Sequence, residues 1–163
     1  MKKIVTLITL SVLTLGIFFS TSIPAKATTI FPSKTSIVML EDGNYLETTI
    51  IDEPKVPSGI SLLSATKTIT RTKITRFKNK NGSILWSVSI TATFTYNGST
   101  SKCTSCSHST TCPSSTWKIK SVSSSRSGNS ATAKAIATRS FNNISENYTK
   151  TVTIKCDKNG NVS

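Results

Sequence analysis

The sequence predicts an all-β protein, an antiparallel β-sandwich of about six or seven strands. From Trp86 to Tyr96, apolar residues occupy every even position and Ser or Thr every odd one. Such alternation is typical of a sheet with one buried and one wet face. Asn-Gly pairs at 81–82 and 97–98 flank this segment and suit the positive φ angles of tight hairpin turns. From Ser61 onward, 39 of 103 residues are Ser or Thr, and evidence for helices is almost absent. Together these features favour consecutive antiparallel strands that close into a sandwich.

The N-terminal segment is typical of a secretory signal peptide. Lys2 and Lys3 precede an apolar run from Ile4 to Phe19, and a small-residue exit ends at Ala27. The run is short for the ~20 residues of a membrane-spanning helix, so a membrane anchor is the weaker interpretation. We therefore expect residues 1–27 to be removed, leaving a protein that is secreted or held at the cell surface and has no transmembrane segment.

The remaining chain divides into an acidic leader and a basic domain. Residues 28–62 predict a small hairpin, from Ser36–Leu40 and Tyr45–Ile51, followed by a Pro-rich linker at Glu53–Gly59. Residues 63–163 are expected to form the basic β-sandwich. Besides Trp86–Tyr96, its expected strands are Lys67–Lys80, Trp117–Val122, Ala131–Ala137 and Tyr148–Cys156.

The charge is strongly positive and unevenly distributed. After Ala27 the chain has 17 basic and seven acidic residues, a net charge of +10, with −3 in residues 28–60 and +13 in 61–163. A basic exported protein meets anionic wall polymers and surface glycans, although positive charge can also simply keep a Ser/Thr-rich domain soluble. No Gly-rich phosphate loop or nucleic-acid signature accompanies the charge, so no specific nucleic acid partner is expected.

The strand from Lys67 to Lys80 concentrates this charge. Ile69 and Phe77 occupy odd positions and Ile74 an even one, which predicts a bulge near Ile74. Such a bulge would bring six basic side chains onto one face as a polyanion-binding stripe: Lys67, Arg71, Lys73, Arg76, Lys78 and Lys80. The alternative is an edge strand whose lysines discourage pairing with another sheet.

Three of the four cysteines and the only histidine lie between Cys103 and Cys112. The Cys103-x-x-Cys106 step suits a zinc site, but His108 follows Cys106 too closely for an ordinary second ligand pair. A redox Cys-x-x-Cys would belong at a helix N-terminus, and this segment lies among strands. An oxidising exterior and an even cysteine count favour disulfides. We therefore expect neither a metal nor a cofactor.

Strand register suggests how the cysteines pair. A two-residue turn at 97–98 places Ala92 opposite Cys103, which then points into the core. Cys156 also falls on an apolar strand face, whereas Cys106 points outward. The preferred disulfides are Cys103–Cys156 in the core and Cys106–Cys112 across an outer loop, and a one-residue bulge would overturn this assignment.

Several segments resemble a family of small exported β proteins of Gram-positive bacteria. The segments that carry the resemblance are Leu85–Val88, Phe94–Ser99, Lys102–Thr104, Ser125–Gly128, Ala131–Ala135 and Thr151–Cys156. The resemblance covers residues 65–163, implies the same strand order and points to Cys103 and Cys156 as a pair. Cys106 and Cys112 are additions in this chain. The family has no established activity, so the resemblance implies no catalytic residues.

Catalysis is not expected. A Ser-His triad needs a carboxylate to orient the base, and the basic domain offers only Glu146 and Asp157 beside the single His108. Four aromatic side chains are candidates for a sugar-stacking platform: Trp86, Trp117, Tyr96 and Tyr148. Trp86 and Tyr96 lie on the apolar face of their strand, which favours a core role.

The sequence thus predicts an exported, non-catalytic protein that binds anionic cell-wall or cell-surface polymers. The alternative is a secreted effector, bacteriocin-like or toxin-like, whose acidic leader masks the basic domain. Five acidic residues lie between Glu41 and Glu53 and six basic ones between Lys67 and Lys80, which motivates the alternative.

Overall fold

The structure, a computed structural model, describes residues 34–52, 66–142 and 144–163, and strands make up most of them. No helix occurs in these ranges, so the predicted all-β class is confirmed. The eight strands are β1 (Lys34–Met39), β2 (Tyr45–Asp52), β3 (Lys67–Lys78), β4 (Ile84–Tyr96), β5 (Ser101–Thr111), β6 (Trp117–Ser127), β7 (Ser130–Phe141) and β8 (Ile144–Lys155).

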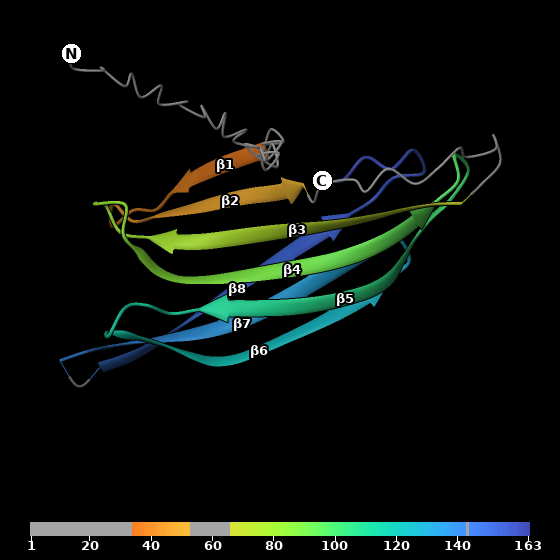
Figure 1. Ribbon diagram of the computed structural model, residues 1–163. Helices are drawn as coiled ribbons and strands as arrows, with labels where there is room; N and C mark the ends of the chain where they lie inside the picture. The colour runs from red at the N-terminus through yellow and green to blue at the C-terminus, as the bar shows by residue number, and fades with distance from the viewer. Residues whose placement is uncertain (1–33, 53–65, 143) are drawn as a thin grey trace, which may run out of the picture.

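The strands form two antiparallel sheets that pack face to face (Figure 1). The larger sheet has the order β1-β2-β3-β4-β5 and the smaller one β6-β7-β8. Every paired strand is therefore a neighbour in sequence, and the described chain passes from one sheet to the other between β5 and β6. The predicted antiparallel sandwich is confirmed, with six strands from the basic region and two more from the acidic leader.

The predicted leader hairpin exists as β1 and β2, but it does not stand apart from the sandwich. β2 pairs with β3 along its whole length, from Tyr45 opposite Lys78 to Asp52 opposite Arg71. The hairpin thus extends the larger sheet by two strands. The predicted signal peptide and Pro-rich linker lie outside the described residues.

The core consists of the inward faces of both sheets. On the larger sheet, β4 contributes side chains at alternate positions that are at most 2% exposed: Trp86, Val88, Ile90, Ala92 and Phe94. Across from them lies an alanine row from β7, at most 1% exposed: Ala131, Ala133, Ala135 and Ala137. Small side chains on one sheet leave room for the large ones on the other, so the interior fills without strain.

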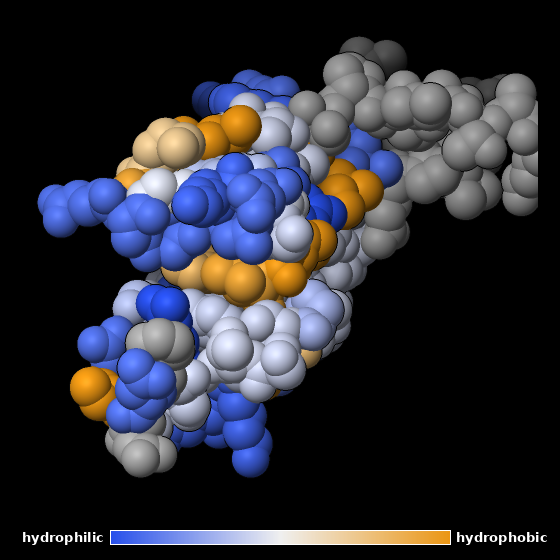
Figure 2. All heavy atoms as spheres, turned by 90° about the vertical axis from the view of Figure 1, so that its left-hand side faces the viewer, coloured by the Kyte–Doolittle hydropathy of each residue, from blue (hydrophilic) through white to orange (hydrophobic). Residues whose placement is uncertain are grey.

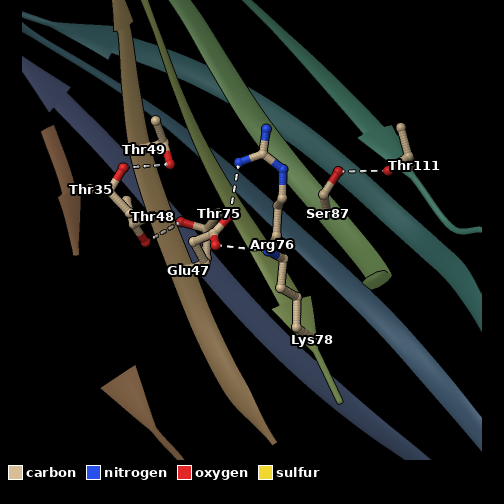
Figure 3. A network of polar contacts seen from close by, with 9 residues as sticks. All are labelled: Thr35, Glu47, Thr48, Thr49, Thr75, Arg76, Lys78, Ser87 and Thr111. Atoms are coloured by element: carbon tan, nitrogen blue, oxygen red, sulfur yellow. Dashed lines mark hydrogen bonds and ion pairs between the residues drawn. The ribbon is translucent and has the colours of Figure 1, made fainter. Parts of the chain in front are cut away.

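Hydroxyl pairs link neighbouring strands within each sheet. On the larger sheet, the Thr72 and Thr91 hydroxyls lie 2.7 Å apart. The Ser87 and Thr111 hydroxyls, shown in Figure 3, also lie 2.7 Å apart. Such cross-strand pairs stabilise a sheet, typically by a few tenths of a kcal/mol each. Many of the Ser and Thr side chains therefore lie on sheet surfaces, where their hydroxyls pair across neighbouring strands.

Three register shifts occur among the described strands, and none interrupts the pairing at Ile74. The shifts fall at Phe77/Lys78, at Thr93/Phe94 and at Ile119/Ser121. β3 pairs with β4 without interruption from Lys67 to Phe77. The predicted bulge near Ile74 is therefore wrong. Ile74 instead lies on the outer face of the sheet, where a β-branched side chain fits a half-buried pleat.

Candidate functional site

The basic residues of β3 are divided between the two faces of the sheet. Because the strand keeps period two, Arg71 and Lys73 share the inward side with Ile69. Arg76 and Lys78 lie on the outer side, beside Glu47 of β2. Lys80 follows the end of the strand. The expected single-faced stripe of six basic residues is therefore wrong.

Acidic residues of β2 neutralise half of these basic residues. The Arg76 Nη1 and Lys78 Nζ atoms donate to the two Glu47 carboxylate oxygens at 3.2 and 2.7 Å (Figure 3). The hydrogen bond from Lys78 and the nearby positive charges hold the pKa of Glu47 below its usual value. On the inward side, Arg71 Nε lies 2.6 Å from the Asp52 carboxylate.

The other basic residues of this strand do not form a common surface either. Lys73 is partly buried, and desolvation lowers its pKa, with a further contribution from the nearby charge of Lys34. Lys67 and Lys80 are exposed, but they lie beyond opposite ends of the ion-paired segment. In the folded chain, β3 is therefore not a free polyanion-binding surface.

The outer face of the smaller sheet combines lysines with hydroxyls. Lys118, Lys134 and Lys155 are exposed on three adjacent strands, each at a position that alternates with buried residues. The other outward positions are Ser121, Ser123, Ser125, Ser127, Ser130, Thr132, Ile136, Thr138, Ser140, Ser145, Asn147, Thr149, Thr151 and Thr153. No carboxylate occurs at any of them. We call this surface the lysine–hydroxyl face.

Sequence reasoning missed the lysine–hydroxyl face although a signal was present. Lys134 stands between Ala133 and Ala135, and both alanines are fully buried. The alternation in Ala131–Ala137 predicts a strand, and its outward positions, like those of Trp117–Val122 and Tyr148–Cys156, include a lysine. The register of the three strands brings their lysines onto one surface.

The segment with three cysteines is a strand rather than a loop. Cys106 lies within β5 and Cys112 directly follows it, six residues further along. An extended chain covers about 20 Å over that distance, whereas a disulfide needs Cα atoms within about 7 Å. All four cysteines are free in the structure. The predicted Cys106–Cys112 bridge is therefore incompatible with the strand.

A bulge also changes the direction of Cys106. The shift at Thr93/Phe94 places Cys103 opposite Phe94 and Cys106 opposite Ala92, so both cysteines face inward. The expected outward orientation of Cys106 is wrong for this reason. Cys103 and Cys156 are buried in one core cluster as predicted, but they form no disulfide. Burial raises the pKa of both thiols, which keeps them protonated and unreactive.

His108 links an edge strand of the larger sheet to an edge strand of the smaller one. Its Nδ1 atom lies 2.8 Å from the Ser124 hydroxyl, which joins β5 to β6. No described carboxylate makes a hydrogen bond to His108, so the pair lacks the third member of a catalytic triad. Within the described ranges, no three His, Cys, Asp or Glu side chains are placed to hold a metal ion.

An aromatic cluster fills one end of the sandwich. The rings of Phe77, Trp86, Trp117 and Tyr148 contact one another with centroid separations of 4.9–6.2 Å. Trp86 is buried, so its expected core role is confirmed, and Tyr96 is partly buried against the same core. Trp117 is also buried, whereas Tyr148 is half-buried. A groove of about 620 Å³ opens beside Phe77, Trp86 and Tyr148. Figure 2 views this end of the molecule and shows an apolar band recessed between polar margins.

The fold and these surfaces define the class of protein, a two-sheet antiparallel β-sandwich with a basic, hydroxyl-rich outer face. The chain matches no protein-family model, no curated protein and no solved structure. In the part of the chain that the structure describes, no helix is long and apolar enough to cross a membrane.

Proposed function

We propose that this chain is an exported, non-catalytic protein that binds anionic cell-wall or cell-surface polymers through its lysine–hydroxyl face. The observation that carries the proposal is the placement of Lys118, Lys134 and Lys155 on one face without a carboxylate. Export rests on the N-terminal 27 residues, which have the composition of a signal peptide.

The physical basis is multivalent charge attraction at a flat surface. Exposed ammonium groups attract phosphate, sulfate or carboxylate groups over roughly one Debye length, about 8 Å at physiological salt. The Ser and Thr hydroxyls between the lysines donate and accept hydrogen bonds, which suits polymers that carry both charge and hydroxyl groups. Acidic residues would oppose this attraction, and none of the described ones lies at an outward strand position of this face.

The test measures adsorption to purified cell walls, soluble polyphosphate and heparin at low and high salt. We expect binding that falls sharply by about 0.5 M salt, because screening removes the attraction. Replacing Lys118, Lys134 and Lys155 together by Gln should weaken low-salt binding by about tenfold. A matched variant replaces Lys67, Lys80 and Lys102, which are exposed but lie elsewhere, and should bind nearly normally. Salt-insensitive binding, or equal loss in both variants, would refute the proposal.

A second candidate function is supported by the ion pairs of β2. Glu47 and Asp52 occupy three basic residues of β3, which fits an acidic leader that masks a secreted effector. Cleavage within residues 53–65 would leave β2 held to β3 by noncovalent contacts alone, and release of the hairpin would then expose Arg71, Arg76 and Lys78. Mass spectrometry of the secreted protein tests this: an N-terminus near Ser61 supports masking, and a stable N-terminus at Thr28 argues against it.

A further inference from the structure

β1 is an unprotected edge strand with an apolar surface. It ends the larger sheet, so β2 is its only described strand partner, and all six of its residues are exposed. Ile37, Val38 and Met39 remain 59%, 56% and 66% exposed. An exposed apolar edge presents free N–H and C=O groups together with side chains that gain from burial, and is a template for pairing with another chain.

The other three edge strands carry features that discourage such pairing. β5 and β6 each contain a register shift, which bends an edge away from regular pairing. β8 carries Glu146, Lys150 and Lys155. β1 pairs with β2 in an unbroken register, contains no proline and has its one charged residue, Lys34, at its first position. Among the edge strands of the described chain, β1 is therefore the one best suited to pairing with another chain.

We propose that β1 pairs antiparallel with β1 of a second copy, which joins the two larger sheets into one continuous sheet. A two-fold axis at Ile37 keeps the inward faces of both sheets on the same side, because residues opposite each other share a face. In this register Ile37 lies opposite the second copy's Ile37. Val38 then lies opposite Ser36, and Met39 opposite Thr35.

The charges at the two ends of β1 favour a second copy over an unrelated partner. Lys34 begins the strand, and Glu41 with Asp42 directly follows it. Antiparallel pairing brings Lys34 of each copy opposite Leu40 of the other, where the turn that carries Glu41 and Asp42 begins, within reach of the long lysine side chain. None of Lys34, Glu41 and Asp42 forms an ion pair within the described chain, and the Asp42 carboxylate accepts hydrogen bonds only from Asn44. The strand is thus complementary to itself in charge, and Ile37 meets its own copy at the two-fold axis.

The dimer should be weak and closed. A six-residue edge buries less surface than the roughly 1,200 Å² at the lower limit of stable interfaces, so association should depend on concentration. An isologous contact uses both copies of the edge at once, and therefore stops at two chains rather than growing into filaments. This inference does not depend on polymer binding.

Analytical ultracentrifugation tests the proposal. The sample is the protein as an expressing cell produces it, and mass spectrometry identifies its N-terminus. We expect the mass to rise towards that of a dimer between about 5 and 500 μM, and Ile37→Lys to weaken association at least tenfold by placing two lysines opposite each other. Ile144→Lys changes an apolar side chain of similar exposure, 64%, on β8 and should leave association unchanged. Val38→Lys provides a second β1 variant if circular dichroism shows Ile37→Lys to be misfolded.

A charge exchange tests the antiparallel register. Lys34→Glu should weaken the dimer because it faces the second copy's acidic residues, and adding Asp42→Lys to the same chain should restore it. A monomer at every concentration, assemblies larger than two chains, or equal weakening by Ile144→Lys would overturn the proposal. Failure of the double variant to restore the dimer would overturn the proposed register.

Discussion

At the scale of single residues, glycine is required where the C-terminal turn packs against β4. Gly98 and Gly160 both have positive φ, +86° and +88°, and the Gly98 N–H donates to the Lys158 carbonyl oxygen at 2.8 Å. A Cβ at Gly160 would lie 2.4–2.8 Å from the Tyr96 ring, whereas a Cβ at Gly98 would meet no atom within 4 Å. Two glycines in similar backbone conformations therefore face different packing demands.

The pair Gly160→Ala and Gly98→Ala separates backbone strain from steric clash. Both variants should lose about 1 kcal/mol because an L-residue is placed in the left-handed region. Gly160→Ala should lose a further 1–3 kcal/mol, because the Tyr96 ring must move. Urea unfolding of the two proteins measures the difference. Equal losses would show that the contact with Tyr96 is not required for stability.

The cysteines differ in burial and should differ in reactivity. Cys103 and Cys156 are buried, and desolvation raises the pKa of both, so little thiolate forms near neutral pH. Cys106 and Cys112 are only partly buried. Desolvation raises the pKa of the Cys112 thiol as well, so access of the reagent rather than thiol acidity separates the two pairs. A thiol reagent should therefore label two cysteines quickly and two slowly in the native protein, and all four in denaturant. Fewer than four in denaturant would reveal a disulfide that the structure does not contain.

At the scale of elements, the attachment of the leader hairpin depends on polar pairing more than on burial. β1 is exposed throughout, and β2 contributes Ile50 as its only buried apolar residue besides the partly buried Leu46. Glu47 and Asp52 supply ion pairs to β3 instead. A hairpin held this way is sensitive to pH and salt, whereas the packed faces of β4 and β7 are not.

Glu47→Gln should weaken the hairpin at neutral pH and have no effect in acid. The fold lowers the pKa of Glu47, so its contribution is present above the unfolded value, near 4.3, and is lost as pH falls through the folded value. Because the pair is partly exposed, we expect a loss of at most about 1 kcal/mol. Unfolding measurements from pH 7 to pH 2 check this, with Glu41→Gln as the unpaired control. A difference that persists at pH 2 would contradict the role of the charge.

At the scale of the whole molecule, one sandwich forms from a series of sequence-adjacent hairpins. The larger sheet places two strands beyond the area that the smaller sheet covers, so stability should differ across the fold. The central strands β4 and β7 carry the most buried residues, and β1 carries none. Local opening is easiest where few apolar contacts must break.

Hydrogen–deuterium exchange should reveal this gradient. In dilute solution we expect the slowest amide exchange in β4 and β7 and the fastest strand exchange in β1, because its outer edge lacks a strand partner in the described chain. At high concentration the β1 amides should become slower as dimers form. Protection of β1 in dilute solution equal to that of β4 would contradict the predicted gradient.

Much of the fold could be predicted because period-two alternation is local and strong. Trp86–Tyr96 showed its buried face directly, and the Asn-Gly turns located two hairpins. The candidate site was harder to predict. The apolar Ile74 predicts a bulge in its strand, but the structure places Ile74 on the outer face of an unbroken strand. Because the faces expected for six basic side chains depend on that bulge, one misplaced residue changes the whole predicted site. A sequence pattern does not fix the pairing register of two strands when the Ser and Thr residues in them are compatible with either face of the sheet.

The sequence by itself determined the all-β class, the alternating core of β4 and the two-strand leader hairpin, because each depends on residues close together in the chain. Tertiary structure decided which surfaces face each other. It joined the hairpin to β3, ion-paired three basic residues with Glu47 and Asp52, and gathered Lys118, Lys134 and Lys155 on one face. A register shift at Thr93/Phe94 turned Cys106 inward. Such outcomes depend on pairing between distant segments, where a shift of one residue exchanges the two faces of a strand.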